Sequence, residues 1–123
     1  LHSFPTRRSS DLRFKNKAKS NGGAINTDKD VNDDNSYINV RFINNTASNG
    51  GAISGYGSSN YNTFNESLFA NNSATTHGGA IYYKGKFNSN IFEYCIFINN
   101  TAQSNGGVIY IYRASNSNKF NKN

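Results

Sequence analysis

The sequence contains very little of several residue types on which common protein classes depend. Its single cysteine, Cys95, excludes a disulfide within the chain and any zinc site built from several cysteines. It has no run of 18 consecutive apolar residues, so it predicts no transmembrane helix. Outside the first twelve residues there is no proline, and Leu68 is the only leucine, which argues against a leucine-rich repeat.

Asparagine, in contrast, is abundant, with 23 copies among 123 residues. Hydrophobic residues amount to only 35%, a composition that would favour disorder, but the 14% of aromatic residues could form a packed core. The length is sufficient for one ordinary domain. The formal net charge of +6 is compatible with acidic partners but identifies none.

The first twelve residues, LHSFPTRRSSDL (Leu1–Leu12), resemble nothing else in the chain. They agree at all twelve positions with one translated frame of a common sequencing adapter; the alternative is a natural arginine-rich targeting segment. We therefore place residues 1–12 outside the fold and assign residues 13–123 to it. The chain lacks an initiator methionine and stops within a repeat, so we expect a fragment of a longer, metagenomic reading frame.

A repeat of 28 residues organises the remainder of the chain. Four glycine pairs recur at this spacing: Gly22–Gly23, Gly50–Gly51, Gly78–Gly79 and Gly106–Gly107. A second word, FINNTA or FANNSA, begins at Phe42, Phe69 and Phe97, with a degenerate copy at Phe14. A third shared word, Asn-x-aromatic, begins at Asn35, Asn62, Asn90 and Asn118. Repetition at a fixed period indicates a solenoid or another repeat architecture.

The length of the repeat selects the architecture. Helical repeats and propeller blades are longer than 28 residues, and Asn, Gly, Ser and Thr interrupt every stretch that could form an amphipathic helix. At about 3.3 Å per residue, one repeat has a contour near 90 Å, enough for three short strands joined by turns. The sequence therefore predicts an all-β fold, a parallel β-solenoid of about four 28-residue coils.

In such a solenoid, equivalent residues of neighbouring coils stack about 4.8 Å apart. We expect one aromatic column at Phe14, Phe42, Phe69 and Phe97, and another at Tyr37, Phe64, Phe92 and Phe120. We expect an aliphatic column at Ile25, Ile53, Ile81 and Ile109. Side-chain amides should form two ladders, at Asn44, Asn71 and Asn99 and at Asn45, Asn72 and Asn100. The glycine pairs supply turn dihedrals that other residues disfavour.

The pairing of GGA[ILV] with FxxN resembles the polymorphic outer membrane protein repeat of bacterial autotransporter surface proteins, and also adhesin-like β-helix proteins of gut and rumen microbes. The first word is met at Gly22–Ile25, Gly50–Ile53 and Gly78–Ile81, and the second at Phe42/Asn45, Phe69/Asn72 and Phe97/Asn100. Gly106–Ile109 fits a degenerate form, and Phe14/Lys17 departs from the pattern. The resemblance covers residues 13–123 and implies a right-handed parallel β-helix of the pectin-lyase-like class, exposed on a cell surface.

The sequence presents no catalytic constellation. Glu66 and Glu93 fall at different repeat positions, so nothing pairs them for acid–base chemistry. His77 replaces the asparagine that precedes the other glycine pairs, which indicates a turn role. Cys95 stands where other repeats have Val40 and Ser67, which indicates an inert, buried thiol.

Two charged segments suggest ligands. Asp28, Asp30 and Asn32 have the alternating oxygen donors that suit a hard cation such as calcium; the alternative is a solvated loop, and no other cofactor is implied. Alternating basic residues should form one face of a strand at Arg13, Lys15, Lys17 and Lys19. This stripe could bind an acidic polysaccharide or be no more than outward-facing charge. Phe14 alternates to the opposite face and no aromatic residue lies on the charged face, so nucleic acid is not expected.

We therefore expect a non-catalytic, adhesin-like or autotransporter passenger segment at the cell surface, the outer membrane or outside the cell. Its partners would be a host surface or glycan, the remainder of its own chain, and other copies bound end to end. The alternative is a fragment of a β-helix polysaccharide lyase or hydrolase with its active site in other coils. A membrane or wall anchor in the missing sequence would favour the first interpretation, and an Asp/Arg-rich coil face the second.

Overall fold

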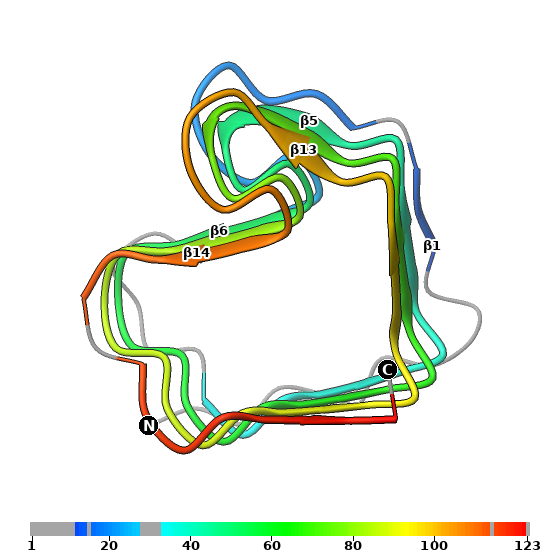
Figure 1. Cartoon of the computed structure of the whole chain (residues 1–123), viewed down its shortest axis with the longest axis vertical. Coiled ribbons are helices and arrows are strands. Elements are labelled where there is room, and N and C mark those ends of the chain that lie inside the picture. Colours follow the sequence, from blue (N-terminus) through cyan, green and yellow to red (C-terminus); the bar gives the residue numbers. More distant parts are fainter. Residues whose placement is uncertain (1–11, 15, 28–32, 114, 123) are drawn as a thin grey trace.

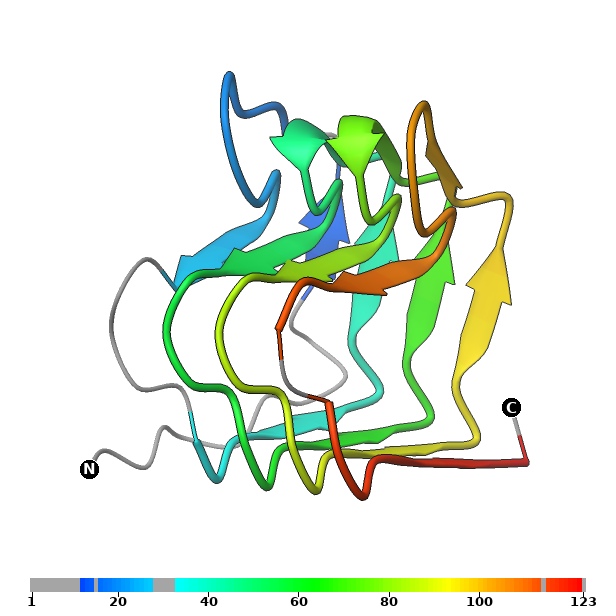
Figure 2. The same cartoon turned by 60° about the vertical axis from the view of Figure 1, so that its left-hand side comes forward.

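The computed structural model describes residues 12–14, 16–27, 33–113 and 115–122. These residues are all-β and form a parallel β-helix, with every strand pair parallel and one coil per repeat. The chain runs counterclockwise in Figure 1, and Figure 2 shows that later coils advance toward the viewer of Figure 1. The helix is therefore right-handed, and the predicted fold class is confirmed.

The strands stack into four sheets, each named here after one of its strands. The β4 sheet contains β1 (Leu12–Phe14), β4 (Arg41–Ile43), β8 (Leu68–Ala70) and β12 (Ile96–Ile98). The β5 sheet contains β5 (Thr46–Asn49), β9 (Ser73–His77) and β13 (Thr101–Ala102). The β6 sheet contains β2 (Ile25–Thr27), β6 (Ile53–Gly55), β10 (Ile81–Tyr83) and β14 (Ile109–Ile111). The β7 sheet contains β3 (Ser36–Ile38), β7 (Thr63–Asn65), β11 (Ile91–Glu93) and β15 (Lys119–Asn121).

Each complete coil thus has four strands, whereas the contour length predicted three. The reason lies in the corners, where a single residue with positive φ turns the chain. Asn39 (φ 54°) precedes β4 and Asn44 (φ 58°) follows it, which confines the strand to three residues. Asparagine tolerates this left-handed conformation better than most residues, so the abundance of asparagine partly reflects these corners.

Two aromatic columns fill the interior. Phe42, Phe69 and Phe97 stack with ring centroids 4.7 and 4.8 Å apart. A second stack, with centroids 4.5 to 4.8 Å apart, is formed by Tyr37, Phe64, Phe92 and Phe120. The isoleucine column is in register at Ile25, Ile53, Ile81 and Ile109. The core also includes Phe87, whose ring lies 4.9 Å from that of Tyr83 and has no counterpart in the repeat words.

Of the two predicted asparagine ladders, the one at Asn45, Asn72 and Asn100 lies inside the coil. The side-chain amide of Asn45 donates to Asn72 Oδ1, and that of Asn72 donates to Asn100 Oδ1, each over 2.9 Å. The same oxygens accept the backbone N–H of Asn45 and Asn72, each over 3.0 Å. A buried amide is therefore hydrogen-bonded to the next coil through both its side chain and its backbone, which compensates for its desolvation.

The other predicted ladder is wrong. Asn44, Asn71 and Asn99 are exposed corner residues with φ between 53° and 58°. Each precedes a buried ladder asparagine, and the corner turns one side chain outward and the next inward. The structure contains a ladder that the sequence did not predict. It begins with the carboxylate of Asp33, whose Oδ1 accepts the N–H of Asn60 over 2.6 Å. Asn60 and Asn88 continue it by accepting the backbone N–H of Asn88 and Asn116.

The two glycines of each pair have different functions. Gly50 turns the chain with φ 62°, and Gly78 and Gly106 have φ 64° and 62°. Gly51 has no such φ, but a Cβ atom there would overlap the carbonyl oxygen of Gly79 and lie 2.7 Å from backbone atoms of Ser73. The second glycine therefore allows neighbouring coils to approach each other closely.

The first coil departs from the predicted register. Phe14 was expected opposite Phe42, but β1 pairs Arg13 with Phe42 and Phe14 with Ile43. The amide ladder accounts for this shift, because Asn16 donates to Asn45 Oδ1 from its side chain over 2.9 Å and from its backbone over 3.1 Å. Leu12, at the end of the segment attributed to the adapter, is the first residue of β1.

Candidate functional site

The described residues bring no group of three or more His, Cys, Asp or Glu side chains together that could hold a metal ion. Glu66 is an exposed corner residue with φ 52°, and Glu93 is half-buried in β11. The predicted calcium ligands Asp28, Asp30 and Asn32 lie outside the described residues. The neighbouring Asp33 is buried and accepts hydrogen bonds from Asn60, so its carboxylate stabilises the stack.

Cys95 is buried at the corner position shared with Val40 and Ser67. Its thiol lies 3.3 Å from the carbonyl oxygen of Phe64 and 3.6 Å from that of Glu93. Burial raises the pKa of the Cys95 thiol above its ordinary value, and hydrogen bonds with the backbone of Ser67 and Glu93 offset this only in part. A thiol that is buried and protonated is a poor nucleophile. Cys95 therefore contributes to the packing of the core rather than to a reactive site.

His77 ends β9 and lies in the column between Asn49 and Asn105. Its Nδ1 is 3.4 Å from the Asn105 amide nitrogen, and its ring stacks on that of Tyr110 with centroids 4.7 Å apart. The backbone then turns at Gly78, as the sequence predicted. The ring contact was not predicted, because Tyr110 lies a full repeat further along the chain.

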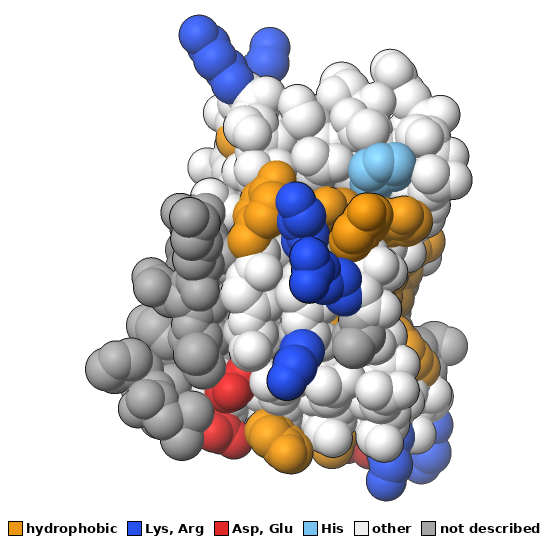
Figure 3. All heavy atoms as spheres, turned by 90° about the vertical axis from the view of Figure 1, so that its left-hand side faces the viewer, with side chains coloured by type: hydrophobic (Ala, Val, Ile, Leu, Met, Phe, Trp, Pro, Cys, Tyr) orange, Lys and Arg blue, Asp and Glu red, His pale blue; other side chains and the backbone are white. Residues whose placement is uncertain are grey.

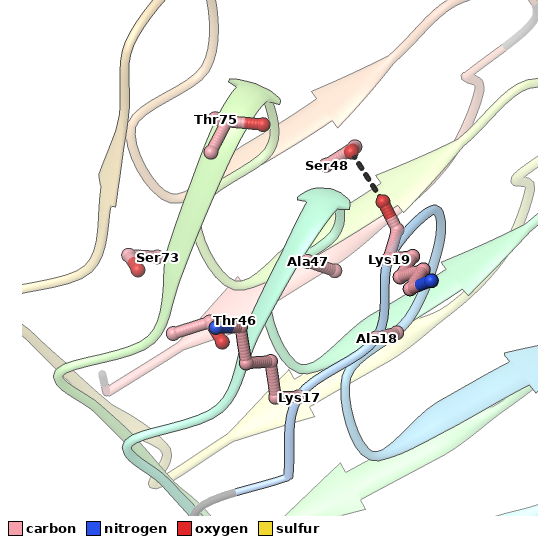
Figure 4. A pocket seen from close by; sticks show the side chains of 8 residues that line it. All are labelled: Lys17, Ala18, Lys19, Thr46, Ala47, Ser48, Ser73 and Thr75. Carbon is pink, nitrogen blue, oxygen red and sulfur yellow. Dashed lines mark hydrogen bonds between the residues drawn. The ribbon is translucent and has the colours of Figure 1, made fainter.

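A shallow groove on the outside of the β5 sheet has a volume of about 580 Å³ (Figure 4). Lys17, Ala18 and Lys19 form one wall, and β5 and β9 supply hydroxyl groups. These hydroxyl groups come from Thr46, Ser48, Ser73 and Thr75. The Ser48 hydroxyl donates to the carbonyl oxygen of Lys19 over 2.8 Å and ties the wall to β5.

The predicted basic stripe is therefore only partly correct. β1 ends at Phe14, Lys17 forms an isolated parallel bridge with Thr46, and Lys19 lies in a bend, so no single strand carries all four charges. Lys15 lies outside the described residues. The groove retains Lys17 and Lys19, both exposed, beside rows of hydroxyl groups. This arrangement can bind an anionic or hydroxyl-rich ligand, but it pairs no acid with a base.

Stacked coils, inward aromatic columns and amide ladders define this chain as a parallel β-helix repeat protein. Residues 39–56, 66–84 and 94–112 match the Chlamydia polymorphic membrane protein repeat. The chain therefore carries three copies of this repeat, which is a repeat of surface proteins. No curated protein and no solved structure gives a significant match to the chain. Within the described ranges, no helix has the length and apolarity needed to cross a membrane.

Proposed function

We propose that this chain is a non-catalytic segment of an adhesin-like surface protein, in which a stiff β-helix displays outward side chains for contact with a host surface or glycan. The three matches to the Chlamydia polymorphic membrane protein repeat support a location at the outer membrane or cell surface. A passenger segment of an autotransporter would have this form.

The observation that carries the proposal is the contrast between the two faces of the same strands. Along the β4 sheet the inward position is phenylalanine in three successive coils, and these rings stack. The outward neighbours in the same coils are Arg41, Leu68 and Ile96, so this position carries a charged residue in one coil and an aliphatic residue in the next two. Packing therefore requires a particular residue inside but not outside. A repeat with this property is a scaffold on which the outer surface can vary without loss of the fold.

The groove beside Lys17 and Lys19 is one described surface that suits a contact of this kind. Both lysines are exposed, and serine and threonine hydroxyls line the adjacent strands. Ammonium groups attract carboxylate or sulfate groups, and hydroxyls exchange hydrogen bonds with sugar hydroxyls.

The test is adhesion of coated beads. Beads coated with the chain should adhere to cultured epithelial cells more than albumin-coated beads do, and Lys17→Gln/Lys19→Gln should lower adhesion. The matched control is Arg41→Gln/Lys119→Gln, which removes the same charge from exposed positions on two other sheets. If chain-coated beads adhere no better than albumin-coated beads, the display function is wrong. If the chain cleaves acidic polysaccharides, the non-catalytic assignment is wrong.

A further inference from the structure

The outer face of the β6 sheet carries a cluster of aromatic and basic side chains that no repeat word encodes. We call it the tyrosine row; its residues are Tyr56, His77, Tyr82, Lys84, Tyr110 and Arg113. Figure 3 shows hydrophobic side chains across this face, with lysine and arginine below them and a histidine above. Tyr82 and Tyr110 occupy the central positions of β10 and β14 and pair directly with each other.

The rings of the row support one another. Tyr82 stacks on Tyr110 with centroids 5.9 Å apart, and His77 lies 4.7 Å from Tyr110 and 6.2 Å from Tyr82. Tyr56 meets Tyr82 edge to face at 6.2 Å. Rings held in this way lose little conformational freedom when a ligand binds. Burial, with the nearby hydroxyls of Tyr56 and Tyr110, raises the pKa of Tyr82 above its ordinary value of 10.0.

A hollow of about 320 Å³ adjoins the row and is lined by Tyr56, Lys84, Gly85 and Arg113. Both charged residues of the lining are basic and exposed. The Lys84 ammonium lies 5.3 Å from the centre of the Tyr56 ring, a cation–π contact that holds the charge beside the hollow. Arg113 adds a planar guanidinium that can bind a carboxylate or sulfate through two hydrogen bonds. The volume is at the lower end of the range for small-ligand sites and is compatible with one or two sugar rings.

The geometry of the tyrosine row favours an anionic polysaccharide over a single-stranded nucleic acid as its ligand. Binding of single-stranded nucleic acid relies on bases that stack on open aromatic faces. In the row, Tyr82, Tyr110 and His77 already stack on each other. Tyr82 is buried among its neighbours, and Tyr56, His77 and Tyr110 are only partly exposed. The row therefore lacks the series of open ring faces that bases need, and its polar groups suit sugar hydroxyls better.

We propose that the tyrosine row and its hollow bind an anionic polysaccharide, with Lys84 and Arg113 recognising a carboxylate or sulfate group and the tyrosines contacting the sugar rings. The proposal rests on the proposed display function, to which it adds a ligand class and a second contact surface distinct from the groove at Lys17 and Lys19.

The test measures binding of the full chain to four immobilised polymers by biolayer interferometry: polygalacturonate, dextran sulfate, neutral dextran and poly(dT). We expect binding to the two acidic polysaccharides that weakens as salt rises, with little binding to neutral dextran. Lys84→Gln/Arg113→Gln should weaken this binding about tenfold or more, the effect expected when two charged hydrogen-bonding groups are lost. Tyr82→Phe/Tyr110→Phe removes two hydroxyls, retains the rings and should weaken it severalfold.

The control Arg41→Gln/Lys119→Gln should change binding by less than about twofold, because it lowers the net charge equally at exposed positions on other sheets. Circular dichroism melts establish that each variant is folded. Equal weakening by the control and by Lys84→Gln/Arg113→Gln would overturn the site, and tighter binding to poly(dT) than to either acidic polysaccharide would overturn the ligand class. Polysaccharide binding without cell adhesion would disprove the display function and leave this site intact. Cell adhesion without polysaccharide binding would disprove this site and leave the display function intact.

Discussion

At the scale of single residues, Phe69 has the most enclosed position in its aromatic column. It is fully buried, with Phe42 stacked on one face and Phe97 on the other. Phe69→Ala leaves a cavity between two rings that the stacked backbone prevents from closing, and should lower the free energy of unfolding by about 3–5 kcal/mol. Thermal or urea unfolding followed by circular dichroism measures the loss.

The matched control is Phe120→Ala in the last described coil, where the ring stacks on Phe92 alone and is 53% exposed. That change should cost less than about 2 kcal/mol, because half of the ring is already in water. If the two substitutions lower the free energy of unfolding equally, stacking within the aromatic column does not stabilise the fold as assigned.

The raised pKa of Cys95 predicts a pH dependence of stability. The unfolded thiol ionises near its ordinary value of 9.0, whereas the folded thiol stays protonated to higher pH because it is buried. Its contribution is therefore complete below pH 9.0 and declines as the pH rises through the folded pKa. Cys95→Ser removes the contribution of the thiol and places at this corner the residue type that Ser67 provides in another coil. Both proteins contain the same eight tyrosines, so comparing them cancels the effect of the tyrosines on stability at high pH.

Urea unfolding of both proteins at several pH values provides the measurement. The stability difference between the original chain and Cys95→Ser should shrink or change sign as the pH rises above 9.0. A difference that stays constant over this range would contradict the assignment. The folded thiol should also resist alkylation until the chain unfolds.

At the scale of the elements, the approach of neighbouring coils sets a limit on side-chain volume. A Cβ atom at Gly51 would overlap the backbone of the next coil, whereas one at Gly107 has no neighbour nearer than the Asn100 carbonyl oxygen at 3.8 Å. Gly51→Ala should therefore destabilise the chain strongly or prevent folding, and Gly107→Ala should change stability by less than about 1 kcal/mol.

Gly51 and Gly107 occupy the same repeat position, so helix or strand propensity cannot distinguish them. The comparison isolates the packing of one coil against the next. Melting temperatures of the two variants measure the difference. Similar tolerance at both positions would show that the coils can move apart at little cost.

At the scale of the whole molecule, the stack ends at strands with an open side. Among the described residues, β14 and β15 each pair with one neighbouring strand, and Val108 and Phe120 are 37% and 53% exposed. Open strand edges and incompletely covered coils promote pairing with other chains. We expect the chain to show β-type circular dichroism and to associate end to end as its concentration rises.

Light scattering after size exclusion follows this association. The apparent mass should increase with concentration, and Val108→Lys/Phe120→Lys, which places charges at the exposed end, should reduce the increase. A folded chain that remains monomeric at about 0.1 mM, within the range in which exposed edges usually aggregate, would exclude end-to-end pairing.

The sequence by itself determined the period, the parallel stacking and most of the interior. Residues 28 apart that repeat phenylalanine, isoleucine or the inner asparagine can bury identical groups only if equivalent positions lie above one another. This is why the columns at Phe42, Phe69 and Phe97 could be predicted without any structure. The second glycine of each pair was recognisable for the same reason, although its function in coil spacing was not.

Only the tertiary structure decided which side chains the corners turn inward and which residues from different repeat positions come into contact. Alternation along a strand cannot tell whether Asn44 or Asn45 points inward, because the chain turns between them with positive φ. The register of the first coil follows the hydrogen bonds of Asn16, which place Phe14 opposite Ile43 rather than Phe42, because the buried Asn45 amide must be paired. The tyrosine row unites six residues that share no repeat word, and only the coiling of the chain brings them together.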